Sequence, residues 1–171
     1  MHPYDAILDF APCRIGAHFT GEALTGLSYL PSDAPLTRNP DQRSMHLANE
    51  LERYMQHPQH HFDLLFVPSG TPFQLRVWRA LLAISAGQVL SYGALATQLN
   101  TAPRAVGQAC GANPLPLVIP CHRVVSVKGL GGFMHAASGA PLDIKAWLLR
   151  HESGIPKSQV FPAIQPHAPP G

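Results

Sequence analysis

The sequence predicts an α+β protein of two domains, and three features of the chain lead to this prediction. Its 171 residues are 46% hydrophobic and 13% charged, so the chain is long and apolar enough to bury a core. Residues 1–68 begin with short strand-like runs, whereas residues 69–154 carry mostly helical patterns. The formal charge also changes, from −4 over residues 1–68 to +5 over residues 69–154. We therefore expect an N-terminal α/β domain over 1–68 and a mostly helical domain over 69–154.

Short apolar runs broken by glycine and polar pairs predict β-structure in the first domain. Residues 4–10 and about 13–30 fit a hairpin or a meander. The segment HFDLLFVP at residues 61–68 is typical of a further strand.

Helices are expected where apolar residues recur at helical spacing behind a capping residue. One covers residues 40–56, with Asn39 and Pro40 as cap and first-turn proline. A second begins with Thr71 as cap and Pro72 as first residue. Further helices are expected over residues 91–99, 104–112 and 142–151.

The pair of short helices at 91–99 and 104–112, joined by a tight turn, has the outline of a helix-turn-helix. The basic balance of the second domain fits a polyanion partner, because neutralising phosphates releases counterions and steers association. Both features also have ordinary explanations. Helical pairs often pack on each other without binding DNA, and a charge of +5 is also that of a solvated surface. The small side chains after Arg104 allow close approach either to a groove wall or to a neighbouring element.

Cysteine and histidine spacing gives no sign of a metal site. The three cysteines are an odd number without a CxxC pair, so neither a disulfide framework nor a cysteine-rich zinc site is expected. His57, His60 and His61 lack a carboxylate or cysteine at ligand spacing, and we interpret them as surface histidines rather than metal ligands. We expect no metal and no cofactor.

The segment from Asn113 to Val125 is the densest in chemistry. Three prolines stiffen an apolar stretch that ends in Cys121, His122 and Arg123. A nucleophilic cysteine needs such neighbours, because the thiolate is the reactive form and a histidine or a cation favours it. The alternative is a core cysteine that lies by chance beside a His-Arg pair.

The segment IPCHRVV stands in one consistent order with four further motifs: SYGALA, RAVG, the Asn-Pro-x-Pro run and KAWLLRHE. Together they resemble the O6-alkylguanine-DNA alkyltransferases (methylated-DNA–protein-cysteine methyltransferases). The resemblance runs from about Thr71 to Glu152, roughly half of the chain, and the Pro-Cys-His-Arg signature is specific. Residues 1–68 fit the family's variable N-terminal domain, an α/β unit resembling ribonuclease H, by size and element order.

The resemblance implies direct DNA repair in a single turnover, with Cys121 accepting an alkyl group from guanine O6. Thymine O4 is a further candidate donor. His122 would pass the thiol proton through a water toward Glu152. Tyr92 would donate a proton to the guanine ring, and Lys145 would tune that tyrosine. The ordinary alternatives are a packing role for Tyr92 and a solvated position for Lys145.

The resemblance also implies how the protein engages duplex DNA. Arg104 would enter the duplex in place of the extruded nucleotide, because O6 lies inside the base stack. Its helix would lie in the minor groove, which encodes little sequence. The implied DNA contacts are Arg104, Ala105, Gly107, Ala109, Asn113 and Arg123. The implied base pocket is lined by Pro116, Val124, Phe133 and Ser138.

These features lead us to expect a monomeric cytoplasmic protein that acts on double-stranded DNA containing O6-alkylguanine, with no membrane segment. Residues 155–171 hold five prolines and are expected to be a disordered tail. The main alternative is a sensor that binds alkylated DNA without repairing it, against which Cys121 argues. A cysteine hydrolase built on Cys121 and His122 is a third reading, but adjacent residues rarely form a nucleophile–base pair.

Overall fold

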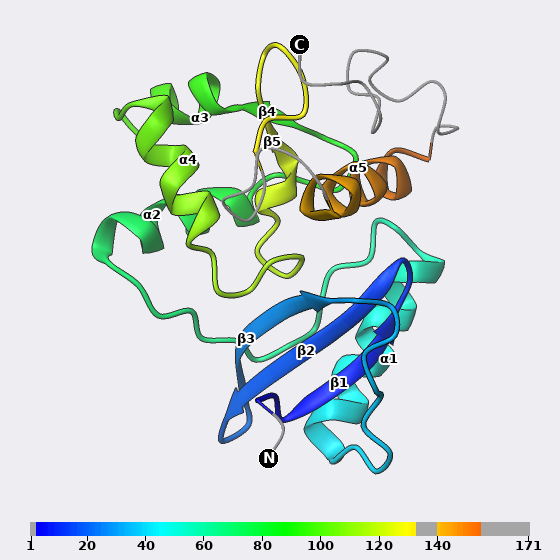
Figure 1. Cartoon of the computed structure of the whole chain (residues 1–171). Coiled ribbons are helices and arrows are strands. Elements are labelled where there is room, and N and C mark those ends of the chain that lie inside the picture. Colours follow the sequence, from blue (N-terminus) through cyan, green and yellow to red (C-terminus); the bar gives the residue numbers. More distant parts are fainter. Residues whose placement is uncertain (1–2, 133–139, 155–171) are drawn as a thin grey trace. The chain divides into compact units, whose positions relative to one another are not determined.

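The computed structural model describes residues 3–132 and 140–154, which form two compact units (Figure 1). The first unit contains the chain up to Ser69 together with Pro114–Val118, and the second contains Gly70–Asn113 and the chain from Ile119 onward. The expected tail at 155–171 and two expected pocket residues, Phe133 and Ser138, lie outside the described residues.

The units depart from the expected division of the chain by one residue at Ser69 and, over a longer stretch, at the segment Pro114–Val118. The sequence placed it in the second domain, but the structure places it in the first unit. There the backbone N–H of Leu27 donates to the carbonyl of Pro114 at 2.9 Å.

Three antiparallel strands form the sheet of the first unit: β1 (Ala6–Phe10), β2 (Cys13–Thr20) and β3 (Ala23–Leu30). They pair in chain order, so the expected meander is confirmed. Gly21 has a positive φ of 58° in the turn between β2 and β3, where a side chain would be strained. The expected strand at 61–68 is reduced to a bridge, in which Phe66 pairs with Leu24 in parallel.

Helix α1 (Gln42–Gln56) packs on this sheet and buries its apolar stripe (Figure 1). The helix is confirmed, but its start is two residues later than expected. The side chain of Asp41 accepts from the backbone N–H of Ser44 at 2.9 Å and so caps the first turn. A carboxylate at this position satisfies an otherwise unpaired donor, so Asp41 is the cap in place of the expected Asn39, and Pro40 lies before the helix.

The described part of the second unit holds four α-helices and a two-stranded parallel ladder: α2 (Pro72–Leu82), α3 (Tyr92–Gln98), α4 (Pro103–Gly111) and α5 (Ala140–Ser153), with β4 (Leu90–Ser91) and β5 (Val124–Val125). The expected cap Thr71 is confirmed, because it accepts from Gln74, and Ser91, at the start of the helix expected over 91–99, caps that helix by accepting from Ala94. The indole N–H of Trp78 donates to the carbonyl of Ala109 at 2.8 Å and fixes α2 to α4. Within the described parts of the chain, no helix has the length and apolar character needed to cross a bilayer.

Candidate active site

Cys121 begins a single 3-10 turn, η1 (Cys121–Arg123), directly before β5. Cys121 is only 2% exposed, and its backbone N–H donates to the carbonyl of Ile119 at 2.8 Å. Asn113, just beyond α4, spans this turn. Its Nδ2 donates to the carbonyl of Ile119 at 2.8 Å, and its side chain also hydrogen-bonds Cys121. The end of α4 is thereby tied to the candidate nucleophile.

The next residue, His122, reaches α5. Its Nε2 lies 2.8 Å from Oε2 of Glu152, and both side chains are buried. An ionised carboxylate only accepts, so Nε2 carries the proton and Nδ1 is left as an acceptor. Among the described residues this buried Nδ1 has no hydrogen-bond partner. The ring therefore has a free basic nitrogen beside the cysteine turn.

Arg123 completes the turn and binds the same carboxylate. Its Nε donates to Oε1 of Glu152 at 2.9 Å and its Nη2 donates to Oε2 at 3.0 Å. The remaining Nη1 donates to the carbonyl of Ile84 at 2.5 Å. The side chain is 12% exposed, so this guanidinium is held inside the protein. The DNA contact expected for Arg123 stays a prediction, and in this structure the guanidinium is engaged by a buried carboxylate, which requires a charged partner.

Burial and neighbouring charges set the protonation states of this group at neutral pH. Burial raises the pKa of Cys121, opposed by the Asn113 hydrogen bond and the charge of Lys145. Burial lowers the pKa of His122 despite the attraction of Glu152. Burial acts to raise the pKa of Glu152, but His122 and Arg123 outweigh it and lower that pKa to about 2. The resting site therefore holds a thiol, a neutral imidazole and a carboxylate.

Tyr92 and Lys145 form a second group of the site. The β4–β5 ladder pairs Leu90 with Val124, which brings the start of α3 beside the turn that follows Cys121. The buried Lys145 Nζ donates to the carbonyl of Val124 at 2.7 Å and to that of Gly132 at 2.8 Å, and lies 3.5 Å from the Tyr92 hydroxyl. Burial lowers the pKa of Lys145 to about 8, so it remains largely charged at pH 7.

The Tyr92 hydroxyl has its own anchor in the glycine run after β5. It donates to the carbonyl of Gly132 at 3.1 Å, and burial raises its pKa, so it is protonated at neutral pH. Gly131 has a φ of 77°, and a Cβ there would lie 2.8 Å from the Tyr92 ring. Sequence reasoning missed this role of Gly131 and of the Gly132 carbonyl. A run of glycines was the available signal, but backbone acceptors leave no mark in side-chain identity.

Helix α4 presents part of the expected DNA-contact set. Arg104 is exposed and makes no hydrogen bond or ion pair with the described part of the chain, while Ala105 and Gly107 are half-buried. Ala109 is 2% exposed, because its side of the helix packs on α2, and the DNA contact expected there stays a prediction. Asn113 is also buried and serves the cysteine turn.

The expected pocket residues are divided between the units. Pro116 is buried in the segment that belongs to the first unit, whereas Val124 lies in the second and accepts from Lys145.

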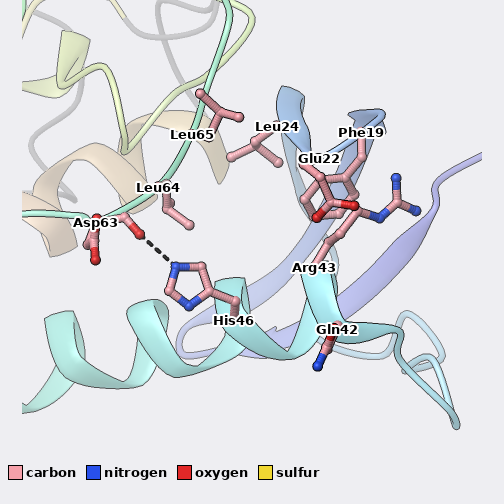
Figure 2. Close-up of a pocket in the computed structure, with 9 residues that line it drawn as sticks. All are labelled: Phe19, Glu22, Leu24, Gln42, Arg43, His46, Asp63, Leu64 and Leu65. Atoms are coloured by element: carbon pink, nitrogen blue, oxygen red, sulfur yellow. Dashed lines mark hydrogen bonds between the residues drawn. The ribbon is translucent and has the colours of Figure 1, made fainter.

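A separate pocket of about 490 Å³ lies in the first unit, and Figure 2 shows the nine residues around it. His46 on α1 extends toward Asp63 and hydrogen-bonds its backbone carbonyl at 2.7 Å. None of the expected site residues lines this pocket. Nearby, His60 bonds the buried Glu50 at 2.7 Å. In residues 3–132 and 140–154, no group of three or more histidines, cysteines or carboxylates is placed to hold a metal ion.

Comparison with known proteins identifies the family. Residues 72–154 match the family model for the 6-O-methylguanine DNA methyltransferase DNA-binding domain. Over 85 residues the chain is 54% identical to the methylated-DNA–protein-cysteine methyltransferase of Salmonella typhimurium, which covers 48% of this chain and 47% of that protein. Over 132 residues it is 38% identical to the Mycobacterium bovis protein of the same name, covering 69% of this chain and 74% of the relative. The chain belongs to the methylated-DNA–protein-cysteine methyltransferase family.

The likeness of this methyltransferase family member extends to solved structures. The crystal structure of Mycobacterium tuberculosis OGT in complex with DNA matches with a TM-score of 0.70 and 32% identity, over 86% of this chain and 92% of that one. The chain spans about half the length of the Salmonella relative. The family expected from the motifs and the mixed α and β fold class are confirmed.

Proposed function

We propose that this chain repairs DNA by moving an alkyl group from guanine O6 in duplex DNA onto Cys121, once per protein molecule. The observation that carries this proposal is the turn Cys121–Arg123, which packs against α5. It places the thiol next to a buried imidazole whose Nδ1 is unpaired among the described residues and whose Nε2 is bonded to a carboxylate. Such a group can take a proton from the thiol and keep it.

The transfer is a displacement at the alkyl carbon. The Cys121 proton passes through one water to Nδ1 of His122, and the resulting imidazolium is stabilised by Glu152 at 2.8 Å. A lone pair of the thiolate forms the new S–C bond, and the electron pair of the broken C–O6 bond passes to the guanine. The product thioether is not readily reversed, so the protein acts once.

The leaving guanine needs a proton as the C–O6 bond breaks. The protonated Tyr92 hydroxyl supplies it to the ring, and the charged Nζ of Lys145, 3.5 Å from that oxygen, stabilises the phenolate that remains. Burial makes this help necessary, because it raises the pKa of Tyr92 and so opposes proton release. No metal or cofactor enters this scheme.

The DNA partner is supported by the family's DNA-binding model and by the OGT structure in complex with DNA. We infer that α4 lies in the minor groove, with Arg104 filling the place of the extruded nucleotide. The exposed guanidinium of Arg104, which has no partner in the part of the chain that the structure describes, and the small side chains at Ala105 and Gly107 support this placement.

Replacing Arg104 with alanine should slow repair of O6-methylguanine in duplex DNA by about tenfold or more, because unstacking a base costs a few kcal/mol that the inserted side chain offsets. Reaction with free O6-benzylguanine should change little, since a free base needs no extrusion. Single-turnover rates with both substrates measure the difference. Arg53→Ala removes an exposed cation of the first unit and is the matched control. Equal losses with both substrates would rule out the proposed role.

The proposed function is tested by intact mass and peptide mapping after mixing with a duplex that carries one O6-methylguanine. We expect one methyl group on Cys121, saturating at one per protein. An unmodified protein that binds the lesion would make the chain a damage sensor instead. A protein that neither binds the lesion nor becomes modified would overturn the proposal.

A further inference from the structure

Glu152 is shared by two donors that differ in what they can give up. His122 Nε2 and Arg123 Nη2 both reach Oε2, at 2.8 and 3.0 Å, while Arg123 Nε takes Oε1 at 2.9 Å. Nε and Nη2 of Arg123 thus form a bidentate contact with the carboxylate, and these two donors are called the fork below. The third nitrogen, Nη1, donates to the carbonyl of Ile84, and this hydrogen bond holds the orientation of the guanidinium plane. The direction of Glu152 toward the imidazole is therefore set by Arg123 as well as by α5.

This arrangement limits where a proton can rest. A carboxylate that accepts both prongs of a guanidinium is hard to protonate, because protonation breaks one charge-assisted bond. Arginine itself does not release a proton in proteins. Glu152, Arg123 and Lys145 are the charged groups that act on the imidazole among the described residues, and none of them is placed to take the proton onward from His122.

We propose that Arg123 is a positioning residue of the proton relay: its fork holds Glu152 as a carboxylate aimed at His122 Nε2, so that the proton taken from Cys121 stops on His122. This inference rests on the proposed function and replaces a transfer that continues to Glu152. In the step, Cys121 loses its proton to a water, which gives one of its own to Nδ1, and Nε2 keeps its proton. One thiolate and one imidazolium form, and nothing is oxidised or reduced.

Arg123 acts on the imidazole in two opposite ways, and this makes the role measurable. The fork aligns the carboxylate that stabilises the imidazolium, but the positive charge of Arg123 also lowers the pKa of His122. The charge alone moves the titration of His122, whatever else Arg123 does. Slow transfer by a folded variant that keeps the charge but loses the bidentate contact is therefore the result that a residue serving only to connect η1 with α5 and Ile84 would not give.

The test compares the wild type with Arg123→Gln and Arg123→Lys, using ¹⁵N-histidine NMR of the free full-length protein between pH 5 and 8. The His122 signals are assigned by their loss in His122→Gln. We expect the glutamine variant to protonate His122 at higher pH, because a positive charge is gone, and to transfer at least tenfold more slowly, because Glu152 is no longer aligned. The lysine variant keeps the charge but lacks the fork, so its titration should stay near that of the wild type while its transfer is slow.

An unchanged His122 titration in Arg123→Gln, or wild-type transfer by Arg123→Lys, would overturn the inference. If the glutamine variant does not fold, the lysine variant still decides the matter through its transfer rate. Arg53→Gln is the control, because Arg53 donates through one nitrogen, at 3.5 Å, to the buried Glu50 of the other Glu–His pair and should alter neither readout. The NMR arm uses no DNA, so a wild type without transferase activity would refute the proposed function without deciding the role of Arg123 in the titration.

Discussion

Replacing Cys121 with serine should abolish alkyl transfer while binding to a duplex that contains O6-methylguanine is retained. The serine hydroxyl has nearly the same size as the thiol, so the buried turn and its Asn113 contact can persist. A serine alkoxide is far less accessible than a thiolate, and the neutral imidazole of His122 is too weak a base to generate one through a water. Intact mass after incubation should show no methyl adduct, and a gel-shift assay should show the complex.

The matched control for this variant is Cys13→Ser. Cys13 is also buried, at 7% exposure, and burial raises its pKa to about 11, but it lies on β2 in the first unit. Its replacement should cost some stability and leave transfer at the wild-type rate. Methyl transfer by Cys121→Ser, or a methyl group found on another residue, would refute the acceptor assignment.

Local features of the site were predictable because their signals lie in neighbouring residues. Capping by Thr71 and Ser91 follows from the next three positions, and both helices begin where these residues predict. The order Cys121, His122, Arg123 indicated a reactive thiol without any knowledge of the fold. The link from His122 to Glu152, thirty positions away, came from the family resemblance and is present in the structure.

Features that depend on which side of an element faces the core were not predictable in the same way. Helix α4 is rich in small residues on every side, so no apolar stripe shows that Ala109 faces α2 while Arg104 faces outward. Arg123 lies in a basic part of the sequence, and its neutralising partner is remote in the chain. Charge counted along the chain therefore does not show which cations are engaged inside the protein.

Two Glu–His pairs in the described part of the chain have similar distances but different surroundings: both carboxylates are buried, whereas His122 is buried and His60 is half-buried. Glu50 accepts from His60 at 2.7 Å and from the backbone N–H of Asp63 at 2.7 Å, and it joins α1 to the following segment. Glu152 accepts from His122 and from both prongs of Arg123. The partners of Glu50 connect α1 with the following segment, whereas Glu152 lies beside the turn that carries the nucleophile. Comparing variants of Glu50 and Glu152 therefore separates the effect of a buried carboxylate on stability from its effect on the rate of alkyl transfer.

Replacing Glu152 with glutamine should lower the rate of alkyl transfer by about 10²–10⁴-fold, because the imidazolium formed on His122 loses its anionic partner. The folded protein should also lose stability. The pKa of Glu152 is lowered from 4.5 to about 2, so the folded protein favours the carboxylate. This stabilisation is fully present above the unfolded pKa and is lost as the pH falls toward the folded one. The difference in unfolding free energy between wild type and variant should therefore be smaller at pH 3.5 than at pH 7.

Urea denaturation at the two pH values and single-turnover kinetics at pH 7 measure these effects, with Glu50→Gln as the matched variant. Its carboxylate is equally buried, and the hydrogen bonds from Asp63 and His60 outweigh burial and lower its pKa too. We therefore expect Glu50→Gln also to be less stable than the wild type. The difference in unfolding free energy should again be smaller at pH 3.5 than at pH 7. Its transfer rate should remain that of the wild type. If both variants lose transfer in proportion to their loss of stability, then Glu152 acts as a structural anion and the proton relay is refuted.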